Sequence, residues 1–299
     1  MSTRNGQQTE EVALIINLRS RWGLGAANVA SRELKRHGLR IGECHLIKTG
    51  RGVVKAAQSA IAKGIRTIVV GGGDGTISAA VDLLANRSDL ALGVLPIGTG
   101  NEVARVLGIP LNIVAAVEVV ARGRVKEVDL AHANGDFFMH TAIVGYPAFI
   151  NFNTPRELKR RFGKLAYVAS FLASMRNIKP FRAEVAAGNN RWEIETVVVI
   201  VGNGRFHVPA RVLLPRSRTP ASGLIVYTPK DYRLSTLLRL AAGLWITRQQ
   251  QPSLIVSSIA DSVKLLTDPP QVVDLDGEYG GTTPIDFHAA RKALRVLVP

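Results

Sequence analysis

The first residues whose types and spacing could do chemistry lie in VVGGGDGTIS, Val69–Ser78. Glycines follow an apolar run there, and one carboxylate, Asp74, stands among them. A glycine-rich turn after a parallel strand lets backbone N–H groups approach phosphate oxygens. A helix beginning near Thr76 would add the partial positive charge of its N-terminus. The spacing matches neither the Walker pattern nor the dinucleotide fingerprint, and the glycines by themselves favour a tight structural turn.

Asp74 shifts this interpretation toward a phosphate site. A carboxylate beside a phosphate is repelled unless a cation lies between them or the carboxylate handles a proton. Phosphoryl transfer has both needs, because Mg²⁺ neutralises the phosphates and a carboxylate orients the hydroxyl nucleophile.

A second glycine-rich turn occurs in LPIGTGNEVARVLGIP, Leu95–Pro110. An apolar run again leads into glycines, at Gly98–Gly100, and Glu102 and Arg105 follow at the head of an expected helix. Two such turns with adjacent acids favour a nucleotide site over a structural coincidence.

These turns need a sheet that brings them together, and the first half of the chain has the pattern for one. Apolar runs alternate with stretches of helical spacing, which predicts parallel βαβ units with helices on both faces. Successive loops of such a sheet gather outside the carboxyl ends of its strands. The expected strands are 11–17, 41–48, 65–70 and 90–96, and the expected helices are 26–38, 52–64, 77–85 and 101–108.

After about Gly123 the pattern changes to short β-rich runs separated by turn residues, which predicts a sandwich or barrel-like second domain. Two longer stretches, 154–180 and 231–249, have helical character. The sequence between the halves has no flexible linker. We therefore expect a tight boundary near Gly123–Asp129, with a cleft between the two domains.

Composition limits the class of partner. The 299 residues carry a formal net charge of +15, which predicts anionic partners: nucleic acid, nucleotide phosphates or an acidic membrane face. Nucleic acid ranks last, because the sequence has no recognised motif or aromatic platform for it. With no signal peptide and no run of about 18 apolar residues, we expect a soluble protein.

The single cysteine and the histidines are not expected to do chemistry. Cys44 cannot form an internal disulfide, and its place in an expected strand predicts a buried structural thiol rather than a nucleophile. The histidines have no zinc-binding spacing. The scattered ones expected to be structural are His132, His140, His207 and His288.

GGDGT at Gly72–Thr76, followed by PIGTGNEVAR at Pro96–Arg105, resembles the diacylglycerol kinase catalytic-domain family. That family includes bacterial soluble lipid kinases and the sphingosine and ceramide kinases, and NAD kinases are more distant relatives. The resemblance covers nearly the whole chain, including DLDGEYG at Asp274–Gly280. It implies an α/β N-terminal domain with a doubly wound, mainly parallel sheet over residues 1–125, to which a closing segment of about 289–299 returns. It also implies a β-rich sandwich domain over residues 126–288 that takes the lipid substrate.

The resemblance also implies site residues and cofactors. ATP is the implied phosphoryl donor, Glu278 the proton acceptor for the lipid hydroxyl, and Asp74 and Glu102 the catalytic residues that organise Mg²⁺ and the transferred phosphoryl group. The implied nucleotide contacts are Asn17, Ser20, Thr49, Gly72, Gly73, Asp74, Gly75, Thr76, Ile77, Ser78 and Thr99. Without the resemblance, Glu278 would be interpreted as an ordinary acid of a hairpin turn, since Asp-Gly is a common turn signal.

The sequence departs from the family pattern at several of these places. Leu18 and Arg21 replace the usual proline and glycine of the opening turn, Glu102 replaces an aspartate, and Ala79 replaces a glutamate. Ser222 replaces the aspartate of a loop that holds a structural Mg²⁺, where the backbone carbonyls of Thr219 and Leu224 would remain. Hard Mg²⁺ favours charged oxygen ligands, so we expect this structural site to be weakened or absent.

The favoured hypothesis is an ATP- and Mg²⁺-dependent kinase acting on the hydroxyl of a diacylglycerol-like or sphingoid lipid, with a lipid pocket that draws on apolar residues of the stretch from Phe137 to Tyr167. We expect a cytoplasmic protein associated peripherally with an anionic membrane through Arg156–Lys164 and Arg211–Arg218. A homodimer is left open, and no nucleic-acid partner is expected. An NAD-kinase-like enzyme, and a nucleotide- or anionic-lipid-binding protein with weak or no catalysis, are the alternatives.

Overall fold

A computed structural model of the protein describes residues 11–20, 22–145, 179–204, 206, 213–215, 222–243 and 249–299. By its contacts the chain divides into two compact units, Met1–Val128 with Lys292–Pro299, and Asp129–Arg291. The chain passes from one unit to the other within two long strands, β5 (Arg124–Ala133) and β16 (Ile285–Val298). These two strands pair with each other. No helix in the described ranges is long and apolar enough to cross a membrane.

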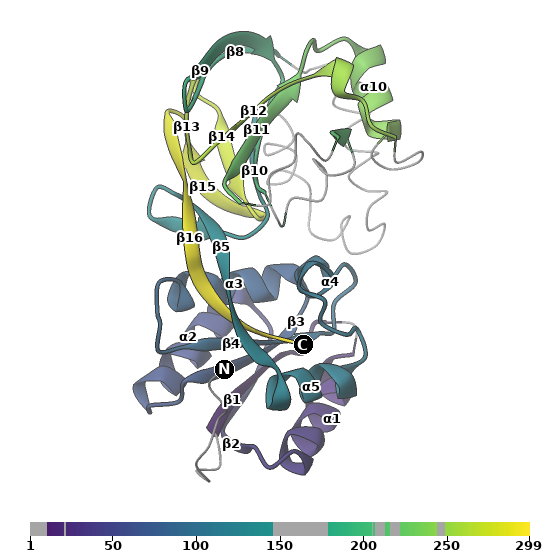
Figure 1. Cartoon of the computed structure of the whole chain (residues 1–299), viewed down its shortest axis with the longest axis vertical. Coiled ribbons are helices and arrows are strands. Elements are labelled where there is room, and N and C mark those ends of the chain that lie inside the picture. Colours follow the sequence, from purple (N-terminus) through teal and green to yellow (C-terminus); the bar gives the residue numbers. More distant parts are fainter. Residues whose placement is uncertain are drawn as a thin grey trace. The chain divides into compact units, whose positions relative to one another are not determined.

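The first unit is built on a mainly parallel sheet (Figure 1). Its strands β1 (Glu11–Asn17), β2 (Arg40–Ile47), β3 (Thr67–Gly72) and β4 (Ala91–Pro96) lie in the order β2-β1-β3-β4. The end of β16 joins β4 in parallel, with Val296 opposite Leu92. β3 and β4 are buried along their whole length, as expected for parallel strands covered on both faces.

Helices cover the two faces of this sheet in pairs. α1 (Gly23–Arg36) packs with α5 (Ile113–Arg122), and α2 (Gly50–Ala62) packs with α3 (Asp74–Leu84). The short α4 (Glu102–Leu107) follows β4. The predicted doubly wound α/β fold is therefore confirmed.

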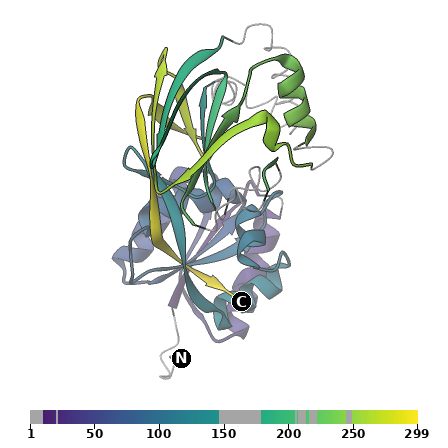
Figure 2. The same ribbon diagram turned by 45° about the horizontal axis from the view of Figure 1, so that its top comes forward.

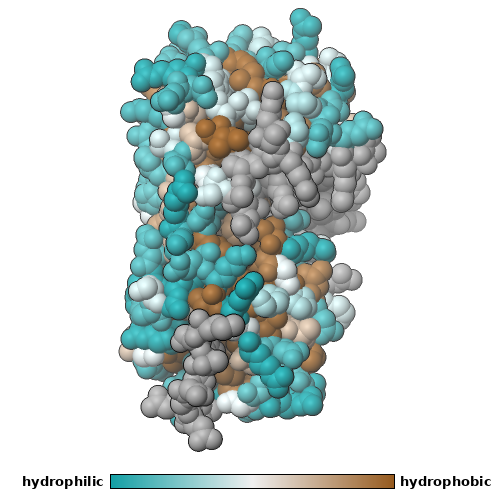
Figure 3. Space-filling view, in the orientation of Figure 1, coloured by the Kyte–Doolittle hydropathy of each residue, from teal (hydrophilic) through white to brown (hydrophobic). Residues whose placement is uncertain are grey.

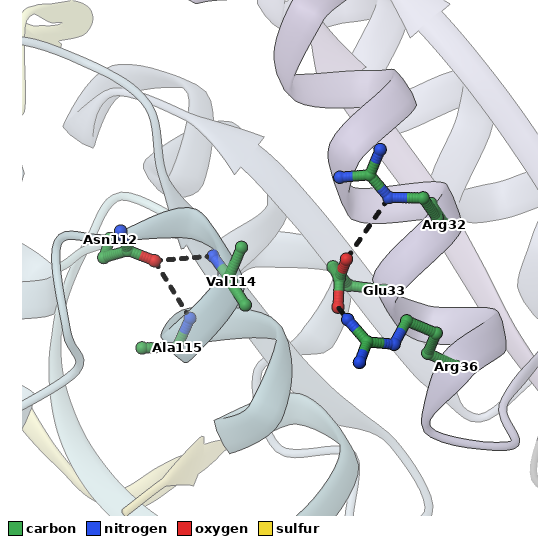
Figure 4. Close-up of polar contacts among 6 residues, drawn as sticks. All are labelled: Arg32, Glu33, Arg36, Asn112, Val114 and Ala115. Carbon is green, nitrogen blue, oxygen red and sulfur yellow. Dashed lines mark hydrogen bonds and ion pairs between the residues drawn. The ribbon is translucent and has the colours of Figure 1, made fainter.

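Each of the helices α1 and α5 has side-chain contacts of its own (Figure 4). Asn112 caps α5, because its Oδ1 accepts hydrogen bonds from the backbone N–H groups of Val114 at 2.9 Å and Ala115 at 3.2 Å. Glu33 of α1 is buried, and its carboxylate is paired with Arg32 at 3.3 Å and Arg36 at 3.2 Å. These two cations compensate a charge that would be costly to bury alone.

The second unit is a sandwich of two sheets. Among the described residues, one of them has six strands in the order β12-β11-β10-β7-β14-β15. The other pairs the first part of β16 with β13, β8 and β9 in turn, and β6 extends β5. The strand bounds are β6 (Asp136–Phe138), β7 (Thr141–Gly145), β8 (Phe181–Ala187), β9 (Asn190–Thr196), β10 (Val198–Asn203), β11 (Leu224–Pro229), β12 (Ile255–Ala260), β13 (Ser262–Asp268), β14 (Val272–Leu275) and β15 (Glu278–Thr282).

The core of this unit lies between its two sheets. Alternate residues of the strands fill it, and Val185, Val199, Val226, Leu265 and Phe287 are all buried in one cluster. Period-two alternation is what places one face of each strand in such a core. The predicted β-rich sandwich is therefore confirmed.

One helix, α10 (Leu234–Ala242), covers the outer face of the six-stranded sheet. Leu224 and Val226 of β11 belong to the core between the sheets. Ile225 and Tyr227 belong to a separate cluster, against which Leu240 of α10 packs. Figure 2 shows α10 flanking these strands. A 3₁₀ turn, Pro252–Leu254, leads into β12. The helix expected at 231–249 is shorter where the structure describes it, and the helix expected at 154–180 lies outside the described residues.

The prediction of a buried Cys44 was wrong. Cys44 is exposed, because β2 is the edge strand of its sheet and pairs only with β1 among the described strands. On this strand Cys44 and Leu46 are exposed, and the buried residue is Glu43, which precedes Cys44 and lies on the opposite face. The apolar run therefore indicated the strand correctly but not which of its faces is covered.

Candidate active site

The direction in which successive strands are added to the first unit's sheet reverses between β1 and β3. This place is the topological switch point of the sheet. The chain leaves β1 for β2 on one side and returns to β3 on the other. In open α/β sheets, ligands bind outside the carboxyl ends of the strands at such a point. Asn17 ends β1 and Gly72 ends β3, so two of the predicted nucleotide residues stand at the switch point.

A side-chain hydrogen bond joins the end of β1 to the helix that follows β3. Asn17 Nδ2 donates to Thr76 Oγ1 at 2.9 Å, and Asn17 Oδ1 accepts from the backbone N–H of Arg19 at 2.9 Å. Thr76 is buried in the first turn of α3. The amide of Asn17 is thus held at both its oxygen and its nitrogen, and it ties the turn after β1 to the helix after β3.

The loops after β3 and β4 approach so closely that the second needs a glycine at Gly98. A Cβ atom on Gly98 would collide with the Cα of Gly73, and a Cβ atom on Gly72 would collide with the side chain of Thr76. Gly75 differs, because it is exposed and nothing lies within 4 Å of the place its Cβ would take. The backbone of the first turn of α3 is therefore accessible to a ligand at Gly75.

Asp74 connects the two loops through its carboxylate. Its Oδ1 accepts a hydrogen bond from the backbone N–H of Val103 at 3.0 Å, and its Oδ2 lies 2.9 Å from where a Cβ on Gly100 would be. Asp74 is itself in the first turn of α3, and Glu102 begins α4. Helix N-termini stabilise negative charge. The structure therefore brings Asp74 and the α4 terminus that bears Glu102 together.

Asn101 is a site residue that the sequence reasoning missed. It is buried, has φ +53°, and shapes the Gly98–Gly100 turn through two hydrogen bonds: its Oδ1 accepts from the N–H of Gly98 at 2.9 Å and its Nδ2 donates to the carbonyl of Gly98 at 3.0 Å. Arg105 Nε donates to the carbonyl of Gly100 at 3.2 Å. Asparagine tolerates the left-handed region better than most residues, and its place before a helix was the signal available in the sequence.

The remaining predicted nucleotide residues at strand ends lie on three different loops. Ser20 is in the turn after β1, Thr49 stands between β2 and α2, and Thr99 is exposed in the loop after β4. Thr49 also has a structural role, because its Oγ1 accepts from the N–H of Gly52 at 3.2 Å and caps α2.

Two further predicted contacts lie within α3. Ile77 has its side chain buried in the core, so only its backbone could face a ligand. Ser78 is the next residue along the helix.

The first unit has two carboxylates of the kind that bind a divalent metal. No cluster of three or more His, Cys, Asp or Glu side chains occurs among the described residues. The carboxylates of Asp74 and Glu102 are hard oxygen donors, which suit Mg²⁺. Mg²⁺ is commonly held by one or two carboxylates together with substrate phosphates and water, so this donor set fits a metal bound with a nucleotide.

In the second unit, the Asp-Gly-Glu sequence forms the turn between β14 and β15. Asp276 and Gly277 have φ +51° and +97°, and Leu275 pairs with Glu278. Two positive φ values at the centre of a two-residue hairpin define a type I′ turn. Glu278 is the first residue after the turn, and its side chain is exposed.

Asp276 anchors this turn to the chain that enters β7. Its carboxylate accepts hydrogen bonds from the backbone N–H groups of Met139 at 2.7 Å, His140 at 3.0 Å and Thr141 at 2.8 Å. The carboxylate of Asp274 accepts from the N–H of Gly277 at 2.5 Å. Asp274 and Asp276 therefore hold the turn through hydrogen bonds, whereas Glu278 is exposed. The spacing of these residues in the sequence does not reveal this difference.

His140, expected to be structural, has a ring nitrogen with no hydrogen-bond partner among the described residues. Its Nδ1 lies 3.3 Å from the carbonyl oxygen of Phe206, and its buried Nε2 has no hydrogen-bond partner in the described part of the chain. Because a carbonyl can only accept, Nδ1 carries the proton and Nε2 presents a lone pair.

The loop predicted to have lost a structural metal shows what its serine does. Ser222 Oγ donates to Asp129 Oδ2 at 2.7 Å. Leu224 opens β11, and Thr219 lies outside the described residues. The weakening of a structural Mg²⁺ site at this loop stays a prediction, and so do the contacts expected at Arg156–Lys164 and most of Arg211–Arg218, which also lie outside the described ranges.

Comparisons with known protein families identify both halves of the chain. Residues 11–133 match the diacylglycerol kinase catalytic domain, and residues 141–298 match the YegS C-terminal NAD kinase beta sandwich-like domain. A probable lipid kinase YegS-like of Pseudomonas aeruginosa is 32% identical over 251 residues, covering 82% of this chain and 80% of that protein. A diacylglycerol kinase of Bacillus subtilis is 29% identical, covering 82% of this chain and 81% of that protein.

Solved structures agree on the fold. A putative diacylglycerol kinase from Bacillus anthracis superposes with a TM-score of 0.77 at 24% identity, over 100% of this chain and 99% of that one. A yeast NADH kinase superposes with a TM-score of 0.50 at 10% identity, over 100% of this chain and 88% of that one. With two domain matches in the expected order and a relative that aligns along most of its length, the chain belongs to the diacylglycerol kinase family and is a kinase.

Proposed function

We propose that this kinase transfers the γ-phosphoryl group of ATP, with Mg²⁺, to the hydroxyl of a diacylglycerol-like or sphingoid lipid. The observation that carries the proposal is the pair of glycine loops after β3 and β4, joined by the hydrogen bond from the N–H of Val103 in α4 to the carboxylate of Asp74. The lipid acceptor is supported by the relatives, which are named as probable lipid kinases and a diacylglycerol kinase.

The nucleotide phosphates would bind the first unit through backbone N–H groups. The accessible backbone at Gly75 and the N-termini of α3 and α4 suit polyphosphate oxygens, because helix N-termini combine N–H donors with partial positive charge. Asp74 and Glu102 would hold Mg²⁺, which neutralises the phosphates when bound. The remaining proposed contacts are Asn17, Ser20, Thr49, Gly72, Gly73, Thr76, Ile77, Ser78 and Thr99.

Glu278 would accept the proton of the attacking hydroxyl. General-base catalysis needs a carboxylate within hydrogen-bond reach of that proton. Glu278 is exposed at a turn whose backbone is fixed by the three N–H bonds to Asp276. Its carboxylate is thus available to a substrate while its backbone is held in place.

The test is transfer of label from γ-labelled ATP with Mg²⁺ into a mixed lipid extract dispersed in detergent. We expect a labelled lipid that is lost with Glu278→Gln and retained with Glu184→Gln, a control at another exposed glutamate on a strand of the same unit. No labelled lipid with ATP binding intact would contradict the proposal. Label transferred to NAD instead would favour the NAD-kinase-like alternative, and no transfer to either would favour a binding protein.

A further inference from the structure

Among the described residues of the second unit, exposed large apolar side chains are most closely spaced along the sequence on α10 and the residues before it. Tyr232, Leu234 and Leu238 are 42%, 54% and 45% exposed. Leu234 and Leu238 are four residues apart, so they lie on one side of the helix. Single exposed leucines are ordinary, but several large apolar side chains within seven residues form a patch that usually marks an interaction surface.

The buried side of the same helix already has its partner. Leu237 packs with Val197 and Val198, and Leu240 packs against the cluster that includes Ile225 and Tyr227. Leu234 and Leu238 are therefore not needed to attach α10 to the sheet. Their exposed side chains lie on the side of the helix that faces away from the sheet.

Cations flank this patch. Lys230, Arg233 and Arg239 are exposed beside it, and Asp231 is the acid within the same stretch. Hydrogen bonds from the hydroxyl of Thr236 and the backbone N–H of Arg233 lower the pKa of Asp231. Asp231 thus holds the first turn of the helix. A second acid, Glu195, accepts a hydrogen bond from the hydroxyl of Tyr232 at 3.4 Å, so three cations beside two acids leave a small excess of positive charge.

We propose that the outward face of α10, formed by Tyr232, Leu234 and Leu238 with Arg233 and Arg239, docks on an anionic lipid bilayer. Leucines on a helix lying in the interface insert into the acyl boundary while arginines meet lipid phosphates. A tyrosine beside them suits the headgroup level. This inference rests on the proposed function, because a kinase that acts on a lipid dissolved in a membrane must reach the bilayer. The binding measurement that tests it does not depend on catalysis.

The test is co-sedimentation of the full chain with vesicles of phosphatidylcholine containing one quarter phosphatidylglycerol, in the absence of nucleotide. We expect binding to these vesicles and little binding to pure phosphatidylcholine. Leu234→Ser with Leu238→Ser should lower the partition coefficient at least about tenfold, because two leucines lose their insertion. Arg233→Gln with Arg239→Gln should lower it about fivefold per arginine at low salt.

Leu266→Ser is the matched control, because Leu266 is 41% exposed in the same unit but on β13. It should bind vesicles as the unchanged protein does. The double leucine variant should also keep its melting temperature and its transfer to lipid in detergent micelles, which separates failure of docking from failure of the proposed function.

Three results would overturn the proposal. The unchanged protein could fail to bind anionic vesicles, the double leucine variant could bind them equally well, or the Leu266→Ser control could lose as much binding as the double variant. A dimer in solution that is lost with Leu234→Ser and Leu238→Ser, without vesicle binding, would instead assign this face to a second copy of the chain.

Discussion

Asp276 and Glu278 are two residues apart, and their surroundings give them different work. Asp276 is turned toward the protein and satisfies three backbone N–H groups, whereas Glu278 is turned toward solvent. A carboxylate that already accepts several protein donors is a structural acceptor. An exposed carboxylate on the same turn can meet a substrate.

Replacing Glu278 with glutamine should remove catalysis and leave the fold intact. A general base contributes about 10² to 10⁴ in rate, so kcat for phosphoryl transfer should fall by that factor. The melting temperature should stay within about a degree, because the side chain is exposed. Steady-state kinetics and thermal unfolding measure the two effects, and a variant with unchanged kcat would exclude Glu278 as the base.

Asp276→Ala should behave in the opposite way and destabilise the second unit. The substitution leaves the N–H groups of Met139, His140 and Thr141 without their acceptor. Unsatisfied donors cost about 1–3 kcal/mol each when fully buried, and this partly buried site should lose roughly 2–4 kcal/mol in total. Urea unfolding measures the loss, and an unchanged midpoint would show that the anchor contributes nothing.

Glu43 should make the first unit sensitive to acid. Hydrogen bonds from His45 at 2.8 Å, from Lys63 and from Ser59 at 3.0 Å lower the pKa of Glu43 from 4.5 to about 2. A depressed pKa in the folded state contributes stability above the unfolded pKa, and this contribution is lost as pH falls from about 4.5 toward 2.

The measurement compares Glu43→Gln with the unchanged protein in urea at pH 5.5 and pH 2.5. The difference in midpoint should be clear at pH 5.5 and should shrink at pH 2.5. Glu118→Gln, at an exposed carboxylate of α5 3.6 Å from Arg122, should show a small difference at both. If the difference in urea midpoint between Glu43→Gln and the unchanged protein is as large at pH 2.5 as at pH 5.5, the carboxylate of Glu43 is not held in its charged form.

At the scale of elements, the candidate site depends on how closely two loops meet. The turns after β3 and β4 touch through Gly73 and Gly98, and Asn17 and Asp74 add one hydrogen bond each across the neighbouring elements. The positions of the helix N-termini therefore depend on backbone contacts that a single methyl group can disturb.

Gly98→Ala should separate these loops and impair nucleotide binding. The new Cβ would collide with Gly73 Cα, so one loop must move. Overpacking of this kind costs about 1–3 kcal/mol, and the affinity for ATP, measured by calorimetry, should fall at least tenfold. Gly25→Ala is the control, because that exposed helical glycine has nothing within 4 Å of its Cβ position. The control should stabilise the protein by up to about 1 kcal/mol, and equal ATP affinity in both variants would contradict the argument.

The sequence predicted the elements better than the contacts between them. The alternation of apolar runs and helical spacing predicted the parallel sheet, and the motifs at Gly72–Thr76 and Pro96–Arg105 predicted the family. The exposure of Cys44 was missed because sheet order decides which strand lies at an edge. The roles of Asn101 and Asp276 were missed because each depends on backbone geometry and, for Asp276, on partners more than 130 residues away.

At the scale of the whole molecule, the first unit needs residues from the far end of the sequence. Lys292–Pro299 belongs to this unit, Val296 pairs with Leu92 of β4, and Ala293 accepts a hydrogen bond from the N–H of Asn86 at 2.7 Å. Figure 1 shows the yellow end of β16 beside the strands of this unit. Figure 3 shows teal polar side chains over much of the visible surface, with brown apolar side chains among them.

A chain ending at Arg291 should lose the stability of the first unit. Leu294, Val296 and Leu297 are fully buried, and such side chains contribute about 1.5–3 kcal/mol each. Their sum is comparable with the 5–15 kcal/mol stability of a whole domain. Hydrogen exchange of the β4 amides should rise toward the unfolded rate. Protection equal to that of the full chain would show that the strand is dispensable.

The contribution of β16 to both units also sets an order of events during synthesis. The ribosome completes Met1–Val128 early, yet this unit lacks its last strand until all of Asp129–Arg291 and the residues after it have been made. At 5–20 residues per second, that interval is roughly 10 to 30 s. For that time the open edge of β4 is a template for unwanted strand pairing. The nascent chain therefore presents an unpaired strand edge until synthesis is nearly finished, and the two units become complete together rather than in sequence.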